Sequence, residues 1–251
     1  MSINTKMSGL DKVKLLKTEL TRFMLTYKFA LEEVNTKINI LSQEFQHIHE
    51  YNPIEHVNSR LKSPESILNK ITRKGCPFSV ESIKENIRDI AGIRIICSYI
   101  SDIYKISEML QKQEDIKVIE VKDYIQTPKP NGYRSLHLII QIPIFMSDRT
   151  EDVYVELQIR TIAMDFWASL EHKIYYKYNK DIPKYINDEL KEAAETANML
   201  DRKMEKLQKE MLLIKEEKNE DENVMDFFIN PSKEILLKTY GFLEKKNWDG
   251  K

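Results

Sequence analysis

The stretch VYVELQIR (Val153–Arg160) decides the fold, because its residues alternate strictly between apolar and polar. Successive side chains of a β-strand point to opposite faces of the sheet. One face of this strand therefore carries Val153, Val155, Leu157 and Ile159. The other face carries Tyr154, Glu156, Gln158 and Arg160. The pattern predicts a strand with one face packed on a core and one face open to water or to a ligand.

Three further runs have the length and the β-branched composition of strands. They are GIRIICSYI (Gly92–Ile100), IKVIEV (Ile116–Val121) and LHLIIQIPI (Leu136–Ile144). A helical pattern, Ile103–Leu110, joins the first two runs. This order of strands and helices predicts an α+β fold with a mixed β-sheet.

Long amphipathic stripes stand on both sides of the strands. Apolar residues recur at spacings of three and four from Val13 to Ile48 and again from Ile186 to Ile214, which predicts long N- and C-terminal helices. The first stripe forms either one long helix or two helices with an unmarked break. Both stripes are explained equally well by packing within the chain and by self-association. We expect a helical segment at 1–50, a core at 51–180, an amphipathic helix at 181–218 and a tail of unknown role at 219–251.

The composition limits the function. The 251 residues include 39 Lys and Arg against 40 Asp and Glu, a net charge of -1, which argues against DNA binding by bulk electrostatics and gives RNA binding no support. No apolar run approaches the roughly 18 residues of a membrane span. We therefore expect a cytoplasmic protein without a membrane partner.

Polar residues on neighbouring strands indicate a site. Arg94 and His137 each interrupt an apolar run, as Glu156 and Gln158 do. Each residue alone could be an ordinary surface residue whose polar groups are hydrogen-bonded. A half-buried face that carries all four together favours a ligand-binding site. If the strand that follows Asp89 lies beside the strand of Glu156, two carboxylates converge as in sites for Mg²⁺ and substrate phosphates. Surface ion pairs remain the simpler explanation of the two acids.

Two other stretches suggest nucleotide binding. Ser63-Pro64-Glu65 predicts a helix start. Four cationic side chains and one hydroxyl lie near this helix start: Arg60, Lys62, Ser66, Lys70 and Arg73. They suit the binding of a polyphosphate, although an ordinary solvent-exposed charged face has the same composition. In KPNGYRSLH (Lys129–His137) a turn precedes a strand, and Tyr133 is placed to stack on a base, unless it is an ordinary core or rim residue.

Four stretches, in order, resemble the synthetase motifs of the RelA/SpoT family. They are RLKSPESILNKITRKG (Arg60–Gly75), RDIAGIRIIC (Arg88–Cys97), KPNGYRSLH (Lys129–His137) and VELQIRTIAMDFWASLEHKIYYK (Val155–Lys177). The similarity covers about residues 50 to 215 and indicates a single-domain small alarmone synthetase. The resemblance implies a nucleotidyltransferase-like mixed sheet wrapped by helices.

The resemblance also implies an activity. A GTP pyrophosphokinase of the stringent response transfers the β,γ-pyrophosphate of ATP to the 3′-hydroxyl of GDP or GTP, which gives AMP and the alarmones ppGpp or pppGpp. Mg²⁺ is the implied cofactor, ATP and GDP or GTP are the implied substrates, and a homotetramer is the implied assembly. Because the chain has no His-Asp dipeptide, we do not expect alarmone hydrolysis.

The resemblance assigns roles to individual residues. Those implied to bind ATP are Arg60, Lys62, Ser66, Lys70, Arg73 and Arg94. Those implied to be catalytic are Asp89, Glu156 and Arg60, with Asp89 and Glu156 also the metal ligands. Those implied to bind GDP or GTP are Lys122, Lys129, Asn131, Tyr133, Arg134, His137 and Gln158. Ser59 stands where many relatives carry Gly, which weakens the role of Arg60.

Two other functions stay open on the sequence. A toxin-like relative would pyrophosphorylate tRNA or adenine nucleotides, although the near-neutral charge disfavours tRNA. A catalytically idle nucleotide or RNA sensor is disfavoured by the intact pair of Asp89 and Glu156. The sequence does not choose among GMP, GDP and GTP as acceptor, and it does not identify a regulator.

Overall fold

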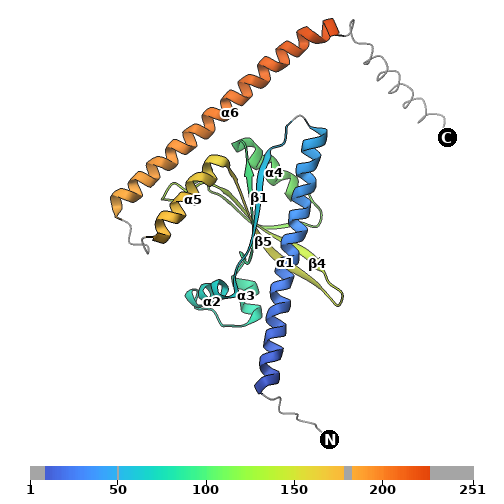
Figure 1. Ribbon diagram of the computed structural model, residues 1–251, viewed down its shortest axis with the longest axis vertical. Helices are drawn as coiled ribbons and strands as arrows, with labels where there is room; N and C mark the ends of the chain where they lie inside the picture. Colours follow the sequence, from blue (N-terminus) through green and yellow to red (C-terminus); the bar gives the residue numbers. More distant parts are fainter. Residues whose placement is uncertain (1–8, 50, 178–182, 227–251) are drawn as a thin grey trace, which may run out of the picture. The chain divides into compact units, whose positions relative to one another are not determined.

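A computed structural model describes residues 9–49, 51–177 and 183–226 of the chain (Figure 1). The chain divides into two compact units, 1–202 and 203–251. The first unit holds the whole β-sheet and every candidate site residue. None of the helices in the described segments is both long and apolar enough to cross a membrane.

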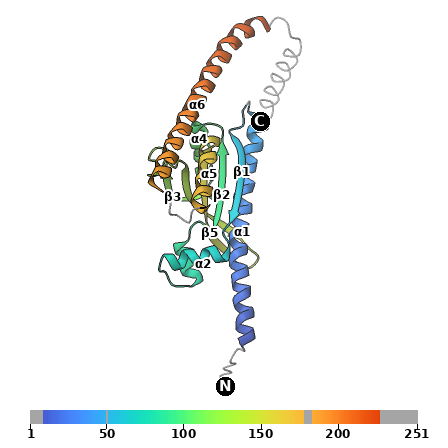
Figure 2. The same ribbon diagram turned by 60° about the vertical axis from the view of Figure 1, so that its left-hand side comes forward.

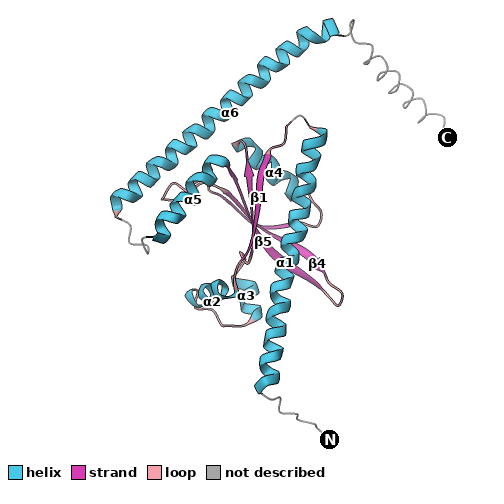
Figure 3. Cartoon of the chain, viewed as in Figure 1, coloured by secondary structure: helices cyan, strands magenta, loops and turns pink. Residues whose placement is uncertain are grey.

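The first unit is built on one five-stranded sheet (Figure 3). Its strands are β1 (Ile54–Leu61), β2 (Ala91–Cys97), β3 (Lys117–Asp123), β4 (Leu136–Phe145) and β5 (Thr150–Thr161). They lie in the order β1-β2-β5-β4-β3, in which β2 and β5 are parallel and every other pair is antiparallel. The predicted mixed sheet is therefore confirmed, and β2 and β5 are neighbours as the metal hypothesis requires.

The apolar face of the sheet packs on α1 (Gly9–Ile48) and α4 (Ile100–Gln111) in one hydrophobic cluster. The first stripe forms one continuous helix, and in Figures 1 and 2 α1 runs along the sheet, in contact with four of its strands. Ala30, Val34 and Ile38 of α1 are fully buried against it. Burial of a Val or Ile side chain contributes about 1.5–3 kcal/mol, so Val34 and Ile38 together stabilise this contact by several kcal/mol.

The predicted start of α2 (Pro64–Arg73) is confirmed by its cap. The Ser63 hydroxyl accepts a hydrogen bond from the Ser66 backbone N–H at 3.2 Å, which satisfies one of the free donors at the helix start. The first predicted strand ends earlier than expected, at Cys97, because Ile100 begins α4. There the Asp102 carboxylate accepts from the Tyr99 backbone N–H at 3.2 Å and caps the helix.

Three elements, β1, α3 (Val80–Asn86) and α5 (Ile162–Lys177), were not predicted from the sequence. β1 is an edge strand in which Ile54 alone is buried, so the alternation of apolar residues that marks β5 is absent from it. Its pairing with β2 supplies the hydrogen bonds that hold it in the sheet. This edge strand carries Arg60, one of the residues that the family resemblance implies to bind ATP.

Two helices follow the sheet, α5 (Ile162–Lys177) and α6 (Lys184–Asp226). The part of α6 that belongs to the first unit packs on α5, where the Trp167 indole N–H donates to the Leu190 carbonyl at 2.8 Å and Ala194 is buried. From Leu200 onward the apolar side chains of the second stripe are exposed. α6 extends past the expected end at 218 to Asp226, and the rest of the expected tail, 227–251, lies outside the described residues.

Gly132 brings the 129–134 loop into close contact with α6. Its φ is +89°, and a Cβ built on it would stand 2.6 Å from the Ala194 Cβ. We expect Gly132→Ala to lower the free energy of unfolding by about 2–4 kcal/mol, because it adds left-handed backbone strain to an overpacked contact. Urea denaturation measures this change.

Gly75 provides a matched control for that substitution. Its φ is +67°, but no heavy atom of the described residues lies within 4 Å of a Cβ built on it. Gly75→Ala should therefore cost only the backbone strain, about 1–2 kcal/mol. Equal losses of stability in the two variants would contradict the close approach of Gly132 to α6.

Candidate active site

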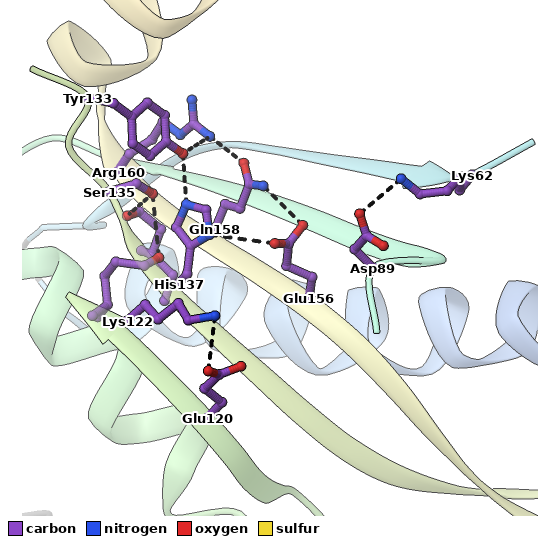
Figure 4. Close-up of polar contacts among 12 residues, drawn as sticks. Lys62, Asp89, Glu120, Lys122, Tyr133, Ser135, His137, Glu156, Gln158 and Arg160 are labelled. Carbon is purple, nitrogen blue, oxygen red and sulfur yellow. Dashed lines mark hydrogen bonds and ion pairs between the residues drawn. The ribbon is translucent and has the colours of Figure 1, made fainter. Parts of the chain in front are cut away.

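The strand register aligns polar side chains in two rows on the face of the sheet away from α1 (Figure 4). The first row runs through Asn58, Arg94, Gln158, His137 and Lys122. The second row runs through Arg60, Gly92, Glu156, Ile139 and Glu120. Because paired residues in a sheet share a face, these side chains face one common space. The polar face predicted from β5, Arg94 and His137 thus extends across all five strands.

Asp89, two residues before β2, is held between two lysines. Its Oδ2 lies 2.9 Å from the Lys62 Nζ and 2.7 Å from the Lys70 Nζ. Burial alone would raise the pKa of the Asp89 carboxyl, but the two ammonium groups outweigh it and lower the pKa. Asp89 is therefore a carboxylate, and its Oδ1 is buried without a hydrogen-bond partner in the described part of the chain.

Glu156 lies on β5 and receives a contact on each carboxylate oxygen. Its Oε1 is 3.5 Å from the His137 Nδ1, and its Oε2 accepts a hydrogen bond from the Gln158 amide nitrogen at 3.1 Å. Burial acts to raise the pKa of Glu156, and so does the charge of Asp89. The contacts from His137 and Gln158 outweigh both effects, so the pKa of Glu156 is lowered and the group is ionised.

Two pockets open on this face, and Asp89 and Glu156 line both of them. The first pocket lies over β1, β2 and β5, and its polar lining includes Asn58, Arg60, Arg94 and Gln158. The second lies toward β3 and β4, and its charged lining includes Lys70, Lys74, Arg88, Glu120 and Lys122. Gly92, between Arg60 and Glu156 in its row, has no side chain to fill the floor of the first pocket. Two cation-lined spaces that meet at two carboxylates have the layout of a site for two phosphorylated ligands and a divalent cation.

The two carboxylates fit Mg²⁺ better than a metal that needs a preformed cage. No cluster of three or more His, Cys, Asp or Glu side chains suited to a metal occurs within the described residues. Mg²⁺ is commonly bound through one or two carboxylates, substrate phosphates and waters. The buried, unpartnered Oδ1 of Asp89 is an oxygen of the kind that such an ion takes as a ligand.

Comparisons with known proteins identify the family of the chain. The family model described as "Region found in RelA / SpoT proteins" matches residues 59–181. GTP pyrophosphokinase YwaC of Bacillus subtilis is 56% identical over 209 residues, which cover 83% of this chain and all of that protein. The chain belongs to the RelA/SpoT family. Within the family it is a small alarmone synthetase.

Solved structures of a second family member show the same fold. Small alarmone synthetase 1 from Bacillus subtilis, bound to its product pppGpp, is 38% identical, with a TM-score of 0.72 over 77% of this chain and 98% of that chain. The same protein bound to AMPCPP is 34% identical, with a TM-score of 0.66 over 77% and 98% of the two chains. The α+β architecture of this family member is thereby confirmed.

The structure brings most of the expected residues of this synthetase together. Those that line a pocket or contact a lining residue are Arg60, Lys62, Lys70, Asp89, Arg94, Lys122, His137, Glu156 and Gln158. Tyr133 joins them through its hydroxyl, 2.7 Å from the His137 Nε2. Lys129 lies over the Tyr133 ring, with its Nζ 4.6 Å from the ring centroid.

Like Lys62, Lys129, Tyr133 and His137, the remaining four expected residues line neither pocket. The Ser66 hydroxyl accepts a hydrogen bond from the Ser63 hydroxyl at the start of α2, and Arg73 is exposed at the end of that helix. Asn131 donates to the Glu171 carboxylate at 3.0 Å. Arg134 is buried against α6. The nucleotide roles of these four residues remain predictions from the family resemblance.

Arg134 is engaged in a structural contact. Its Nη2 lies 3.0 and 3.1 Å from the two carboxylate oxygens of Glu195, and its Nη1 donates to the Gly132 carbonyl. We expect Glu195→Gln to raise the KM for the guanine acceptor about tenfold, because the loop that carries Tyr133 loses its anchor on α6. Steady-state kinetics with varied acceptor measure this change.

A comparison on the same helix separates anchoring from direct binding. Glu192→Gln changes an exposed acid near Glu195 and should leave the KM for the acceptor unchanged. If Arg134 bound the nucleotide without help from α6, Glu195→Gln would match Glu192→Gln.

Arg160 and Asp165 were not predicted from the sequence to belong to the site. Asp165 Oδ1 lies 3.1 Å from the Arg94 Nη1 and 3.4 Å from the Arg160 Nη1, so it links the two arginines. The alternation in β5 placed Arg160 on the same face as Glu156, and this was the sequence feature from which its place in the site could have been predicted. No sequence pattern predicted the contact of Asp165 with either arginine, because Asp165 lies on the following helix.

Proposed function

We propose that this protein, a GTP pyrophosphokinase by its family relatives, transfers the β,γ-pyrophosphate of ATP to the 3′-hydroxyl of GDP or GTP. The observation that carries the proposal is the meeting of the two cation-lined pockets at Asp89 and Glu156. One pocket would take the donor nucleotide and the other the acceptor, with the reacting groups between the two acids. A reaction on these nucleotides would take place in the cytoplasm.

Cations around the first pocket would hold the donor phosphates. Arg60 and Arg94 line that pocket, Lys70 lines the second pocket, and Lys62 and Lys70 both contact Asp89, which lines both pockets. Catalysis of phosphoryl transfer depends on positioning the substrates and stabilising charge more than on covalent chemistry by the protein. Arginine forks and lysine point charges supply both functions for a triphosphate. The family member solved with AMPCPP, an ATP analogue, supports this assignment.

Asp89 and Glu156 would hold Mg²⁺ together with the donor phosphates. A bound Mg²⁺ supplies positive charge that neutralises the phosphate oxygens. Its presence would also explain why two carboxylates stand near each other on a buried face. The two lysines on Asp89 would then become available to the phosphates.

Acceptor residues would place the 3′-hydroxyl near Glu156. Tyr133 would stack on the guanine, while His137, Gln158 and Lys122 would line the nucleotide. Base stacking on an aromatic ring contributes about 1–3 kcal/mol. Glu156, held ionised by His137 and Gln158, would orient the 3′-hydroxyl or take its proton. The family member solved with pppGpp supports a guanine nucleotide as acceptor.

One assay tests this function. Purified protein is incubated with Mg²⁺, labelled ATP and, in separate reactions, GMP, GDP, GTP, ADP and tRNA, and the products are separated. We expect AMP and a 3′-pyrophosphorylated guanine nucleotide with GDP or GTP. A product with ADP or tRNA alone would favour a toxin-like relative, and no product with any acceptor would favour an idle sensor.

We also propose that the enzyme is a homotetramer. Exposed apolar side chains on α6 offer a surface for a second copy, and they include Leu200, Met204, Leu207 and Met211. Light scattering at micromolar concentration should give about four times the monomer mass. A mass near the 29.8 kDa of one chain would contradict the proposal.

A further inference from the structure

Arg160 joins Tyr133 and Gln158 in the polar network but lines neither pocket. Its residue surface is 2% exposed. The two hydrogens of its Nη2 are directed to the Tyr133 hydroxyl, at 3.2 Å, and to the Gln158 Oε1. Its Nη1 faces Asp165. Arg160 therefore acts through other residues and not by contact with a nucleotide.

The hydrogen bond to Tyr133 fixes the direction of a chain that ends at Glu156. An arginine side chain donates and never accepts, so the Tyr133 hydroxyl must accept from Arg160. The single proton of that hydroxyl then remains available for donation to the His137 Nε2, which lies 2.7 Å away. A neutral imidazole that accepts at Nε2 carries its proton on Nδ1. His137 Nδ1 is the atom that faces the Glu156 Oε1 at 3.5 Å.

The hydrogen bond to Gln158 fixes a second, shorter chain. A carboxamide can be turned by 180°, which exchanges its oxygen with its NH₂ group. Because Arg160 only donates, it requires the oxygen of Gln158 on its own side. The amide nitrogen then points to Glu156 and donates to Oε2 at 3.1 Å. The reverse orientation would set NH₂ against the guanidinium and leave Oε2 facing an oxygen.

We propose that Arg160 is a positioning residue that fixes the proton position on His137 and the orientation of Gln158, so that each presents an N–H to Glu156. The catalytic consequence rests on the proposed function of Glu156. Glu156 Oε2 accepts from the Gln158 amide and Oε1 faces the His137 Nδ1, which would leave the remaining lone pairs of the carboxylate for the metal and the acceptor hydroxyl. The proton position itself is a property of the free protein.

Nitrogen-15 NMR of the free protein reads the proton position on His137 directly. Spectra are recorded at alkaline pH, where an ordinary imidazole is neutral. The chain has five histidines, and a His137→Gln sample assigns the signal. In the wild type we expect the Nδ1–H form to predominate. In Arg160→Met the Tyr133 hydroxyl is no longer forced to donate, so we expect a shift toward the Nε2–H form.

Two further variants separate this role from folding and from simple charge balance. Tyr133→Phe removes the hydroxyl that links Arg160 to His137, and it should also shift the proton toward Nε2 even if Arg160→Met does not fold. Asp165→Asn removes a charge partner of Arg160 but leaves both hydrogen-bond chains in place, so the Nδ1–H form should persist. An Nε2–H form in the wild type, or an unchanged His137 signal in Tyr133→Phe, would overturn the proposal.

Kinetics then test the catalytic consequence. Folded Arg160→Met should lose about tenfold or more in kcat, while its KM for ATP stays within about twofold, because Glu156 is misoriented but the donor cations remain. An unchanged kcat would overturn the catalytic part. Because the NMR measurement needs no substrate, an incorrect proposed function would leave its result unaffected.

Discussion

Asp89→Asn should reduce the synthesis of the alarmone by at least about a thousandfold while the protein stays folded. The neutral amide cannot replace the carboxylate as a ligand of Mg²⁺. It also leaves the Lys62 and Lys70 ammonium groups without the charge that now holds them at 2.9 and 2.7 Å. Product formation from labelled ATP and GDP measures the loss, and circular dichroism verifies the fold.

Asp152→Asn is the matched control for this substitution. Asp152 is exposed on β5, the strand that also carries Glu156, and lines neither pocket. We expect it to synthesise product at the rate of the wild type. An Asp89→Asn protein with nearly normal turnover would refute the assignment of Asp89 to the metal.

Glu156→Gln should lower kcat by about 10²–10⁴-fold and change the KM for ATP much less. Glutamine has the same shape as glutamate, so the strand and the pocket keep their form. It lacks the charge that would attract the metal and the 3′-hydroxyl, and its NH₂ group would face a donor from His137 or Gln158. Initial rates over a range of ATP and GDP concentrations separate kcat from KM.

A control at the start of the same strand is Glu151→Gln. Glu151 pairs with Lys84 at 2.8 Å and with Arg149 at 2.6 Å, outside both pockets. Its loss should reduce stability slightly and leave kcat unchanged. Equal kcat values for Glu156→Gln and Glu151→Gln would remove Glu156 from the reaction.

The centre of the site could be predicted because one strand shows its two faces in the sequence. The alternation of Val153–Arg160 identified the polar face, and the position of Asp89 just before β2 placed a second acid at the sheet. Both inferences needed only the period of a strand and the assumption that the two strands are neighbours. The parallel pair of β2 and β5 confirms that assumption.

Contacts between distant elements were beyond the sequence. β1 is an edge strand held by its pairing with β2, so its own residues carry little apolar pattern. Arg134 and Glu195 are 61 residues apart, and nothing near either residue indicates that they meet. The role of Arg160 depends on the directions of four hydrogen bonds, which the order of residues does not specify.

A crystal structure of the protein with Mg²⁺, AMPCPP and GDP tests the roles of the two carboxylates and the two pockets most directly. We expect one metal ion bound by Asp89 and Glu156, the AMPCPP phosphates against Arg60 and Arg94, and the GDP ribose with its 3′-hydroxyl directed to Glu156. A metal that neither carboxylate binds, or nucleotides bound away from the two pockets, would contradict these roles.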